Sequence, residues 1–305
     1  MKGRLAFVLG GGGARGALQA GALRALSEAG YQPDLLVGTS VGAVNAAFLG
    51  IHGFSKKSLD LLAETWLKAA EADLLPSNYL WITLRSLLRR YQGDSTNQMR
   101  DFFIENGLLP DLCFRDITSM QLIIVAADLN TGKQVLYGQK PSQSILEAVL
   151  ASTALPPWVK PVEKNGQLLI DGGAVSSLPI EAALRAGASE IIALDLADPH
   201  SIVQDGSGFG PFFTKLINTV EQRQVELETA LAQAYRVPLL HVRLSADEPV
   251  QLWDFNRPKE LIQKGYQITR ESIVAYRGTT RDGWVEKVKR WFSFPTANNH
   301  DKRKR

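Results

Sequence analysis

Short apolar runs alternate with helix-forming segments at the start of the chain. The runs 4–10 and 34–38 are nearly all apolar, which is typical of strands buried on both faces of a sheet. They are followed by two segments that favour helices, 14–30 and 40–51, and the first of these ends at Gly30, a common C-terminal cap. This β-α-β-α order predicts a parallel sheet with right-handed crossovers.

The hydrophobic pattern then changes, because residues 55–107 indicate helices without strands. Three helical segments are expected there, at 55–70, 77–92 and 95–106. Strand patterns return at 121–129 and 133–138, which together predict a hairpin. We therefore expect a helical insertion after the second helix, followed by a return to the sheet.

Strands and helices are mixed in the remainder of the chain. A helix at 142–153 is ended by Pro156 and Pro157, and the stretch 160–173 predicts two strands around an Asn-Gly turn. The other expected elements are a helix at 179–188, strands at 190–197 and 237–244, and helices near 257–277 and 281–292.

These elements predict one domain of the α/β class over residues 1–295. The expected architecture is a three-layer sandwich in which a central, mainly parallel sheet is flanked by helices. No internal repeat or low-complexity linker divides the sequence. Residues 296–305 are expected to form a disordered basic tail.

Composition and charge narrow the class of protein. Of the 305 residues, 45% are hydrophobic and 21% are charged, as in an ordinary globular protein. The net charge of +3 lies partly in the terminal DKRKR, so the nearly neutral body gives no case for nucleic-acid binding. The single cysteine, Cys113, excludes a disulfide framework and a cysteine-based metal site within one chain. Because neither a signal peptide nor a membrane-spanning apolar run is present, we expect a cytoplasmic protein.

Four consecutive glycines, Gly10–Gly13, follow the first predicted strand. The stretch Gly11–Gly16 fits the dinucleotide-binding pattern G-x-G-x-x-G between a strand and a helix. A dinucleotide site also needs an acidic residue at the far end of the second strand, whereas the nearest candidate, Asp34, lies before that strand. A P-loop would need lysine where the chain has Ala17. A Rossmann-type nucleotide-binding protein is therefore only an alternative.

The second predicted strand ends in GTSVG, residues 38–42, which matches G-x-S-x-G at a strand-to-helix turn. A nucleophilic serine on so sharp a turn needs small residues two positions away on both sides, where strand and helix crowd together. Gly38 and Gly42 provide that clearance, and the following helix points its free amides toward Ser40. Ser40 is therefore a candidate nucleophile.

The two glycine motifs follow adjacent strands at the same edge of the predicted sheet. The amides of the glycine loop can therefore lie beside Ser40, where acyl transfer needs donors for the developing oxyanion. Arg15 either holds the shape of this loop or adds positive potential. A purely structural tight turn is the weaker interpretation of the glycines.

A nucleophilic serine needs a base, for which histidine is the usual residue. Three of the four histidines lie in a strand, in the tail or a helix length away from the turn, namely His241, His300 and His52. Only His200 follows the end of a strand, which makes it the one histidine in a suitable position.

Asp171 is the better candidate base. It ends an apolar strand and is followed by Gly172 and Gly173, so its carboxylate can approach another backbone closely. In a partly dry pocket this carboxylate gains basicity and can take the serine proton directly. Asp128 and Asp195 also lie near strand ends, and turn or cap roles account for both of them.

The motifs GGGGARG, GTSVG and DGG, in this order and spacing, resemble those of the patatin-like phospholipase family. The resemblance extends to ASTALPPWVKPV, VAADLNTG and LPIEAALRAGA, and it covers residues 5 to about 195. The later stretch 252–269 is similar to the C-terminal helix region of bacterial members.

This resemblance implies a patatin-like fold with a catalytic dyad of Ser40 and Asp171 that works through an acyl-enzyme without histidine. It also implies an oxyanion hole in the glycine loop, built from Gly11, Gly12, Gly13 and Arg15. The expected reaction is hydrolysis of a carboxylic ester bond in a lipid, of the phospholipase A or lysophospholipase type, with no metal and no cofactor.

Two segments are candidates for the surface that meets the lipid. Residues 80–91 place apolar side chains on one helical stripe with arginines mostly opposite, which is typical of an interfacial helix and equally of a helix packed on its own core. Residues 208–216 carry phenylalanines after glycines. Either segment can form a lid, a membrane contact or a dimer surface.

The expected partner is a lipid or membrane-surface ester, met through transient contact with the inner face of a membrane, and a homo-oligomer stays open. Two other functions also stay open: nucleotide binding, and a non-catalytic adaptor on the same fold. Acyl transfer to an acceptor other than water would use the same residues, so the sequence does not separate a hydrolase from a transferase.

Overall fold

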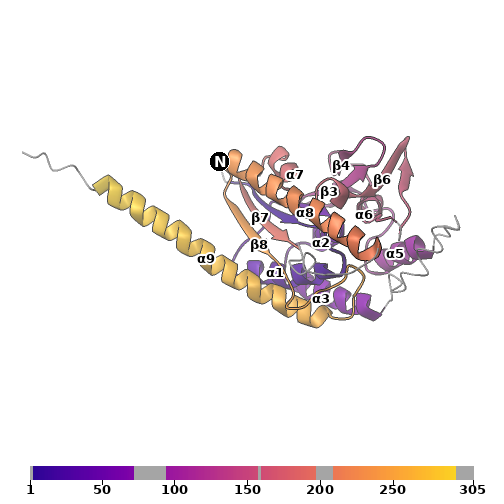
Figure 1. The fold of residues 1–305 in the computed structure, drawn as a ribbon, viewed down its shortest axis with the longest axis horizontal. Helices are drawn as coiled ribbons and strands as arrows, with labels where there is room; N and C mark the ends of the chain where they lie inside the picture. Colours follow the sequence, from indigo (N-terminus) through magenta and orange to yellow (C-terminus); the bar gives the residue numbers. More distant parts are fainter. Residues whose placement is uncertain (1–2, 72–93, 157–158, 197–208, 293–305) are drawn as a thin grey trace, which may run out of the picture.

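Figure 1 shows a sheet covered by helices on both faces. The computed structural model describes residues 3–71, 94–156, 159–196 and 209–292. Its strands are β1 (Leu5–Leu9), β2 (Leu35–Thr39), β3 (Gln121–Asp128), β4 (Lys133–Tyr137), β5 (Val162–Lys164), β6 (Gln167–Asp171), β7 (Glu190–Asp195) and β8 (Leu239–Arg243). They form one eight-stranded sheet in the order β5-β6-β3-β2-β1-β7-β8, with β4 also paired to β3.

The middle of the sheet is parallel and one edge is antiparallel. Strands β3, β2, β1, β7 and β8 pair in parallel. Strands β4 and β6 both run antiparallel to β3, and β5 runs antiparallel to β6. The β5–β6 hairpin turns at Asn165 and Gly166, whose φ values of 49° and 78° suit a two-residue turn with both residues left-handed. The expected α/β fold is confirmed.

The helices form two layers around this sheet. They are α1 (Gly16–Glu28), α2 (Val41–His52), α3 (Lys56–Glu71), α5 (Asp94–Glu105), α6 (Ile145–Ser152), α7 (Ile180–Arg185), α8 (Phe209–Ala234) and α9 (Pro258–Phe292). In β1, Phe7 and Leu9 face a core shared with α1, α2, α3, α5, α6 and α9. Ala6 and Val8 face the opposite core, shared with α7 and α8. This alternation along the strand produces three layers.

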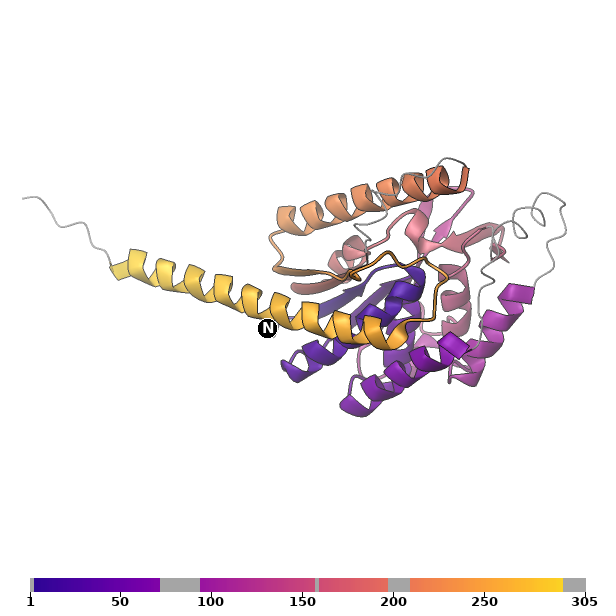
Figure 2. The ribbon, with the colours of Figure 1, turned by 60° about the horizontal axis from the view of Figure 1, so that its bottom comes forward.

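Helix α1 is buried along most of its length because it lies between the sheet and α9. A Cβ on Gly21 of α1 would lie 1.8 Å from the carbonyl oxygen of Ile262, and a Cβ on Gly265 of α9 would lie 1.9 Å from that of Leu18. Only glycine permits two helix backbones to approach this closely. Figures 1 and 2 show α9 beginning beside α1 and then extending beyond the rest of the fold.

Two features near the C-terminus differ from the sequence expectations. The segments 257–277 and 281–292 belong to one helix, α9, of 35 residues, rather than to two helices. Gly278 lowers helix propensity between them by about 1 kcal/mol, but no proline is present to stop the helix. Helix α8 is the second difference, since the sequence pattern predicts no element over residues 217–234.

Several expectations are not tested by the described residues. The helix predicted at 77–92, the tail at 296–305, and His200 and His300 all lie outside them. The single domain over 1–295 stays a prediction. None of the helices that the structure describes is long and apolar enough to cross a membrane.

Candidate active site

Ser40 lies on the turn between β2 and α2 in a strained backbone conformation. Its φ of 55° and ψ of −127° are rarely adopted by a residue with a side chain. Its amide donates to the Ser152 hydroxyl at 2.9 Å, and that hydroxyl donates to the carbonyl oxygen of Val125 at 2.6 Å. The turn is therefore tied to β3 through one side chain of α6. The sequence motifs gave no signal for this role of Ser152.

The glycines on both sides of Ser40 are required by close backbone contacts. A Cβ on Gly38 would lie 2.4 Å from the carbonyl oxygen of Gly42, and a Cβ on Gly42 would lie 2.1 Å from that of Leu9. Since backbone atoms cannot move aside as the end of a side chain can, any other residue at these positions would deform the turn. The turn has the features of a nucleophile elbow.

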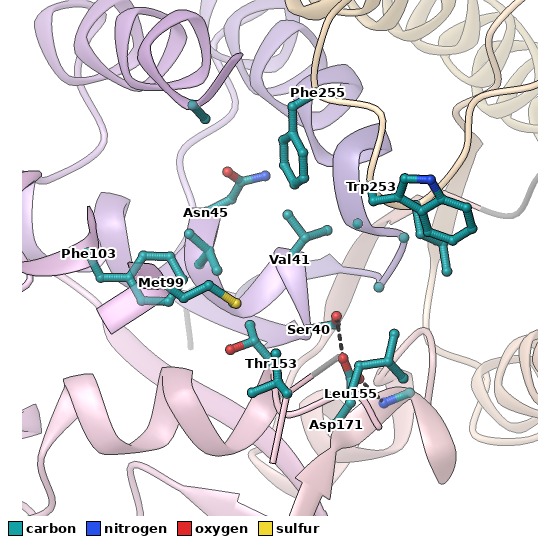
Figure 3. Close-up of a pocket in the computed structure, with 18 of the residues that line it drawn as sticks. Ser40, Val41, Asn45, Met99, Phe103, Thr153, Leu155, Asp171, Trp253 and Phe255 are labelled. Carbon is teal, nitrogen blue, oxygen red and sulfur yellow. Dashed lines mark hydrogen bonds between the residues drawn. The ribbon is translucent and has the colours of Figure 1, made fainter. Parts of the chain in front are cut away.

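Asp171 reaches Ser40 from an antiparallel strand. Strand β3 continues three residues beyond Val125, the partner of Thr39, and β6 pairs with this extension, so that Asp171 ends β6 opposite Ala126. The Ser40 hydroxyl donates to Asp171 Oδ2 at 2.6 Å. Figure 3 shows the two side chains facing each other across this bond.

The glycines after Asp171 shape its surroundings. A Cβ on Gly172 would lie 2.3 Å from the carbonyl oxygen of Val125, so the chain passes directly against β3. The Gly173 amide donates to Asp171 Oδ1 at 2.8 Å. Both carboxylate oxygens are therefore held, one by a backbone amide and the other by Ser40.

Burial raises the pKa of Asp171 to about 6, against the smaller lowering effects of its hydrogen bonds from Ser40 and Gly173. The side chain is only 5% exposed. Above pH 6 this carboxylate is ionised and more basic than an ordinary aspartate, which suits it to accept a proton from a hydroxyl.

The glycine loop lies beside Ser40, since a Cβ on Gly11 would approach the Ser40 Cβ to 3.2 Å. The Gly11 amide is already paired with the carbonyl oxygen of Ser177 at 2.9 Å, so it is not a free donor. Among the described residues, the Gly12 and Gly13 amides donate to no protein acceptor. The loop thus leaves two adjacent N–H groups available.

Arg15 is buried, and its Nε donates to the carbonyl oxygen of Gly12 at 3.2 Å. The Arg15 amide donates to the same oxygen at 3.2 Å, while the Ala14 amide donates to the carbonyl oxygen of Leu252 at 2.8 Å. Arg15 therefore holds the loop from inside, which agrees with one of the two roles expected from the sequence.

A cavity of about 340 Å³ opens at Ser40 and Asp171. Its walls are mostly apolar, with side chains from α2, α3 and α5 that include Phe48, Leu62, Trp66, Met99 and Phe103. Leu252, Trp253 and the α8 residues Ile217 and Val220 also contribute. In Figure 3, Met99 and Phe103 lie on one side of Ser40 and Trp253 on the other. Both its size and its lining are typical of a small-molecule site.

The cavity contains a further carboxyl group that no sequence motif indicates. Glu221 of α8 lines the cavity and is partly buried. Burial raises its pKa to about 7, with Arg15 lowering it and the negative charges of Asp171 and Asp195 raising it further. Because the sequence does not predict helix α8, no sequence pattern indicates that Glu221 faces the cavity.

The other candidate acids and histidines take different roles. Asp128 accepts from the Asn130 amide at 3.1 Å and from the Thr131 hydroxyl at 2.9 Å, which is the turn role expected for it. Asp195 pairs with His241 Nε2 at 2.9 Å, across neighbouring strands, and the turn or cap role expected for it from the sequence stays a prediction. His52 ends α2 as expected.

The structure also bears on two ligand classes, dinucleotides and metal ions. Asp34 lies before β2 and accepts from the Leu5 amide at 2.9 Å, so it is not placed to bind a ribose beyond the end of that strand. Within the described ranges, no group of three or more His, Cys, Asp or Glu side chains is arranged to hold a metal ion.

Comparison with protein-family models matches residues 7–184, more than half of the chain, to the family described as "Patatin-like phospholipase". The chain is 28% identical over 306 residues to "Patatin-like phospholipase domain-containing protein 7" of Mus musculus, covering 93% of this chain and 21% of that protein. It is 30% identical over 192 residues to "Uncharacterized NTE family protein MT2641" of Mycobacterium tuberculosis, covering 63% of this chain and 30% of that protein. The chain therefore spans between about a fifth and a third of the length of these curated relatives.

Similar solved structures include VipD from Legionella pneumophila, which aligns with 90% of this chain and 67% of its own at a TM-score of 0.48 and 14% identity. Human GIVD cytosolic phospholipase A2 in complex with methyl gamma-linolenyl fluorophosphonate aligns with 91% of this chain and 59% of its own, at a TM-score of 0.48 and 13% identity. Sequence identities this low give no information about the activity of this chain.

Proposed function

The chain belongs to the patatin-like phospholipase family, and we propose that it hydrolyses carboxylic ester bonds of lipids through Ser40 and Asp171. The observation that carries this proposal is the 2.6 Å hydrogen bond from the Ser40 hydroxyl to Asp171 Oδ2, at the opening of an apolar cavity. A hydroxyl on a strained turn, bonded to a buried carboxylate, has the arrangement of an activated nucleophile.

In the proposed acylation step, Ser40 Oγ attacks the ester carbonyl carbon while its proton passes to Asp171 Oδ2. The C–O bond to the alcohol then breaks, and Asp171 returns the proton to the departing alkoxide. An acyl group is left on Ser40. The raised pKa of Asp171 supports both halves of this step, since the group must accept and then release a proton near neutral pH.

The negative charge that develops on the carbonyl oxygen needs hydrogen-bond donors. We assign this role to the Gly12 and Gly13 amides, which are the unpaired donors of the loop among the described residues. Gly11 instead leaves space for Ser40, because a Cβ there would lie 3.2 Å from the Ser40 Cβ. Removal of one such donor from an enzyme costs about 3–4 kcal/mol of transition-state stabilisation.

Deacylation uses the same groups with water as the nucleophile. Asp171 takes a proton from the water, whose oxygen attacks the acyl carbon, and the proton is then passed to Ser40 Oγ as the fatty acid leaves. Neither half of the cycle requires a histidine or a metal ion in this proposal.

The cavity supports a lipid substrate. We place the acyl chain against the apolar side chains of α2, α3 and α5, and the alcohol portion toward Trp253 and α8. An ester of a lipid or of a membrane surface is the proposed substrate, met by transient contact with the membrane at its cytoplasmic face.

The test is hydrolysis of p-nitrophenyl octanoate by the wild type, Ser40→Ala, Asp171→Asn and His200→Ala, with folding checked by circular dichroism. We expect turnover by the wild type and by His200→Ala, and loss in the other two variants. Activity that survives Asp171→Asn but is lost in His200→Ala would reject Asp171 as the base. No activity in any form, on this ester or on phospholipid vesicles, would favour a non-catalytic adaptor.

A further inference from the structure

A chain of buried amide groups connects the cavity wall to the glycine loop. The Trp66 indole N–H donates to Asn45 Oδ1 at 3.1 Å, and Asn45 Nδ2 donates to Gln19 Oε1 at 2.9 Å. Gln19 Nε2 donates in turn to the carbonyl oxygens of Gly10 at 2.9 Å and Leu194 at 3.2 Å. The Asn45 and Gln19 side chains are fully buried. Three helices are joined to the start of the loop in this way.

The direction of this hydrogen-bond chain is fixed by Trp66. An indole nitrogen can only donate, so the Asn45 amide must turn its oxygen toward Trp66 and its nitrogen toward Gln19. The second N–H of Asn45 donates to the carbonyl oxygen of Gly16 at 3.1 Å. These hydrogen bonds therefore hold both residues that flank the loop, Gly10 and Gly16.

Trp66 is also a wall of the cavity. Its indole ring stacks on Phe255 with 6.1 Å between ring centroids and 18° between ring planes, and both rings line the cavity. The same ring lies against the loop, because a Cβ on Gly16 would approach Trp66 Cζ2 to 2.7 Å. Trp66 is therefore in contact with both the acyl-chain space and the base of the loop.

We propose that Trp66, Asn45 and Gln19 are positioning residues that hold the glycine loop in the shape that presents Gly12 and Gly13 to the oxyanion. This inference rests on the oxyanion role proposed for that loop. It goes further by assigning Trp66 an effect on the rate of acyl transfer, in addition to its place in the wall of the cavity.

A wall residue and a positioning residue affect different kinetic constants. A wall residue acts on substrates whose acyl chain reaches it, mainly through KM. A residue that positions the oxyanion donors acts on kcat, and it does so even for an acetyl ester that is too short to reach the aromatic rings.

The test compares Trp66→Phe with Phe255→Leu, using p-nitrophenyl acetate and p-nitrophenyl octanoate. Phenylalanine keeps an aromatic wall but removes the donor that orients Asn45. We expect Trp66→Phe to lower kcat roughly tenfold on both esters, the scale of one lost buried hydrogen bond. Phe255→Leu is expected to act mainly by raising KM for the octanoate, with a smaller effect on kcat for the acetate than Trp66→Phe has. An effect of Trp66→Phe confined to KM for the octanoate would overturn the proposal.

Hydrogen–deuterium exchange provides a readout that does not depend on activity. The amides of Gly10, Gly11, Ala14 and Arg15 are hydrogen-bonded, so a loosened loop should exchange them faster. We expect faster exchange in peptides covering 10–16 for Trp66→Phe but not for Phe255→Leu, with the distant strand 133–137 unchanged in both. Unchanged exchange at 10–16 in Trp66→Phe would reject the positioning role, and this result can be read even if the wild type hydrolyses no ester. Absence of hydrolysis would instead reject the proposed function.

Discussion

Two buried carboxylates occupy matching places on either side of the central strand β2. Asp171 ends β6 and Asp195 ends β7, and each of these strands is separated from β2 by one intervening strand. The side chains are 5% and 3% exposed, respectively. Asp171 accepts a hydrogen bond from the Ser40 hydroxyl at 2.6 Å, whereas Asp195 pairs with His241 Nε2 at 2.9 Å.

The local backbone decides which carboxylate reaches Ser40. On the β6 side, Gly172 passes so close to β2 that a Cβ there would lie 3.1 Å from Thr39 Cγ2. On the β7 side the glycine loop intervenes, because a Cβ on Gly12 would lie 2.7 Å from the Cβ of Leu196. The described residues that line the cavity include Asp171 but neither Asp195 nor His241.

An aspartate–histidine pair is therefore not by itself a catalytic signal in this fold. The pair familiar from serine hydrolases is present at the edge of the sheet, and the serine faces a different acid. The proposed base and the structural aspartate–histidine pair differ in the access of the carboxylate to Ser40, and not in the type of acid.

The largest expected effect comes from neutralising each acid in turn. Asp171→Asn keeps the shape of the side chain but removes the proton acceptor, so kcat/KM for p-nitrophenyl butyrate should fall at least about 1000-fold. Asp195→Asn should change it less than about threefold, since this acid does not line the cavity. Equal losses in the two variants would contradict the assignment of Asp171, and not Asp195, as the base.

A smaller loss is expected from crowding the loop that separates Asp195 from Ser40. Gly12→Ala should push the loop away from Leu196 and misplace its amides, which lowers kcat on the same ester by about 100-fold. Gly187→Ala is the control for a glycine substitution that crowds no neighbour, because no atom lies within 4 Å of its Cβ position, and any cost of its φ of 82° falls on the control alone. A normal kcat in Gly12→Ala would remove Gly12 from the proposed oxyanion hole.

The two acids should have opposite effects on stability. Burial raises the pKa of Asp171 to about 6 from 3.8, so its ionisation destabilises the folded state as pH rises from about 4 to about 6. Asp171→Asn should therefore raise the free energy of unfolding by about 2–3 kcal/mol at pH 8 and leave it nearly unchanged at pH 3.5.

Asp195→Asn should instead lower the free energy of unfolding at pH 8 by about 1 kcal/mol, because it weakens the hydrogen bond to His241. Urea denaturation at both pH values measures these differences. If Asp171→Asn lowered the free energy of unfolding at pH 8, burial of the ionised Asp171 carboxylate would not be destabilising, contrary to this prediction.

The smallest expected effect is the shift that Asp195→Asn causes in the pH dependence of kcat/KM. Since Asp171 must be ionised to act as the base, kcat/KM should fall about tenfold per pH unit below pH 6. The Asp195→Asn variant should keep this midpoint within about 0.3 pH unit, as its charge is not the proton acceptor. A pH–rate profile of the two proteins measures the midpoint, and a shift by a full unit would show that Asp195 controls the base.

Much of the fold can be predicted from the sequence because its signals are local. The apolar run of β1, the glycine turn after it and the Asn-Gly hairpin at 165–166 are each specified by a few adjacent residues. The sequence pattern does not predict helix α8, because the helix buries a charged residue and exposes several apolar ones. Glu228 is buried, whereas three of its apolar side chains are at least 44% exposed, namely Leu216, Val220 and Leu227.

The candidate site divides in the same way. Ser40 and Asp171 were found because each lies in a short motif at the end of a strand. The hydrogen bond from the Ser40 amide to the Ser152 hydroxyl, and the one from the Gly11 amide to Ser177, join residues more than 100 positions apart. No local pattern encodes such contacts, so the number of free amides in the loop could be counted only from the structure.

The most direct test of the central claim is the covalent labelling of Ser40 by a long-chain alkyl fluorophosphonate, followed by peptide mapping with mass spectrometry. In this reaction Ser40 Oγ forms a bond to phosphorus and fluoride leaves. The account predicts a single adduct on Ser40, formed at similar rates in the wild type, Asp195→Asn and His241→Ala, and at least about 100-fold more slowly in Asp171→Asn. An adduct on another residue, or labelling that is slowed by His241→Ala and not by Asp171→Asn, would contradict it.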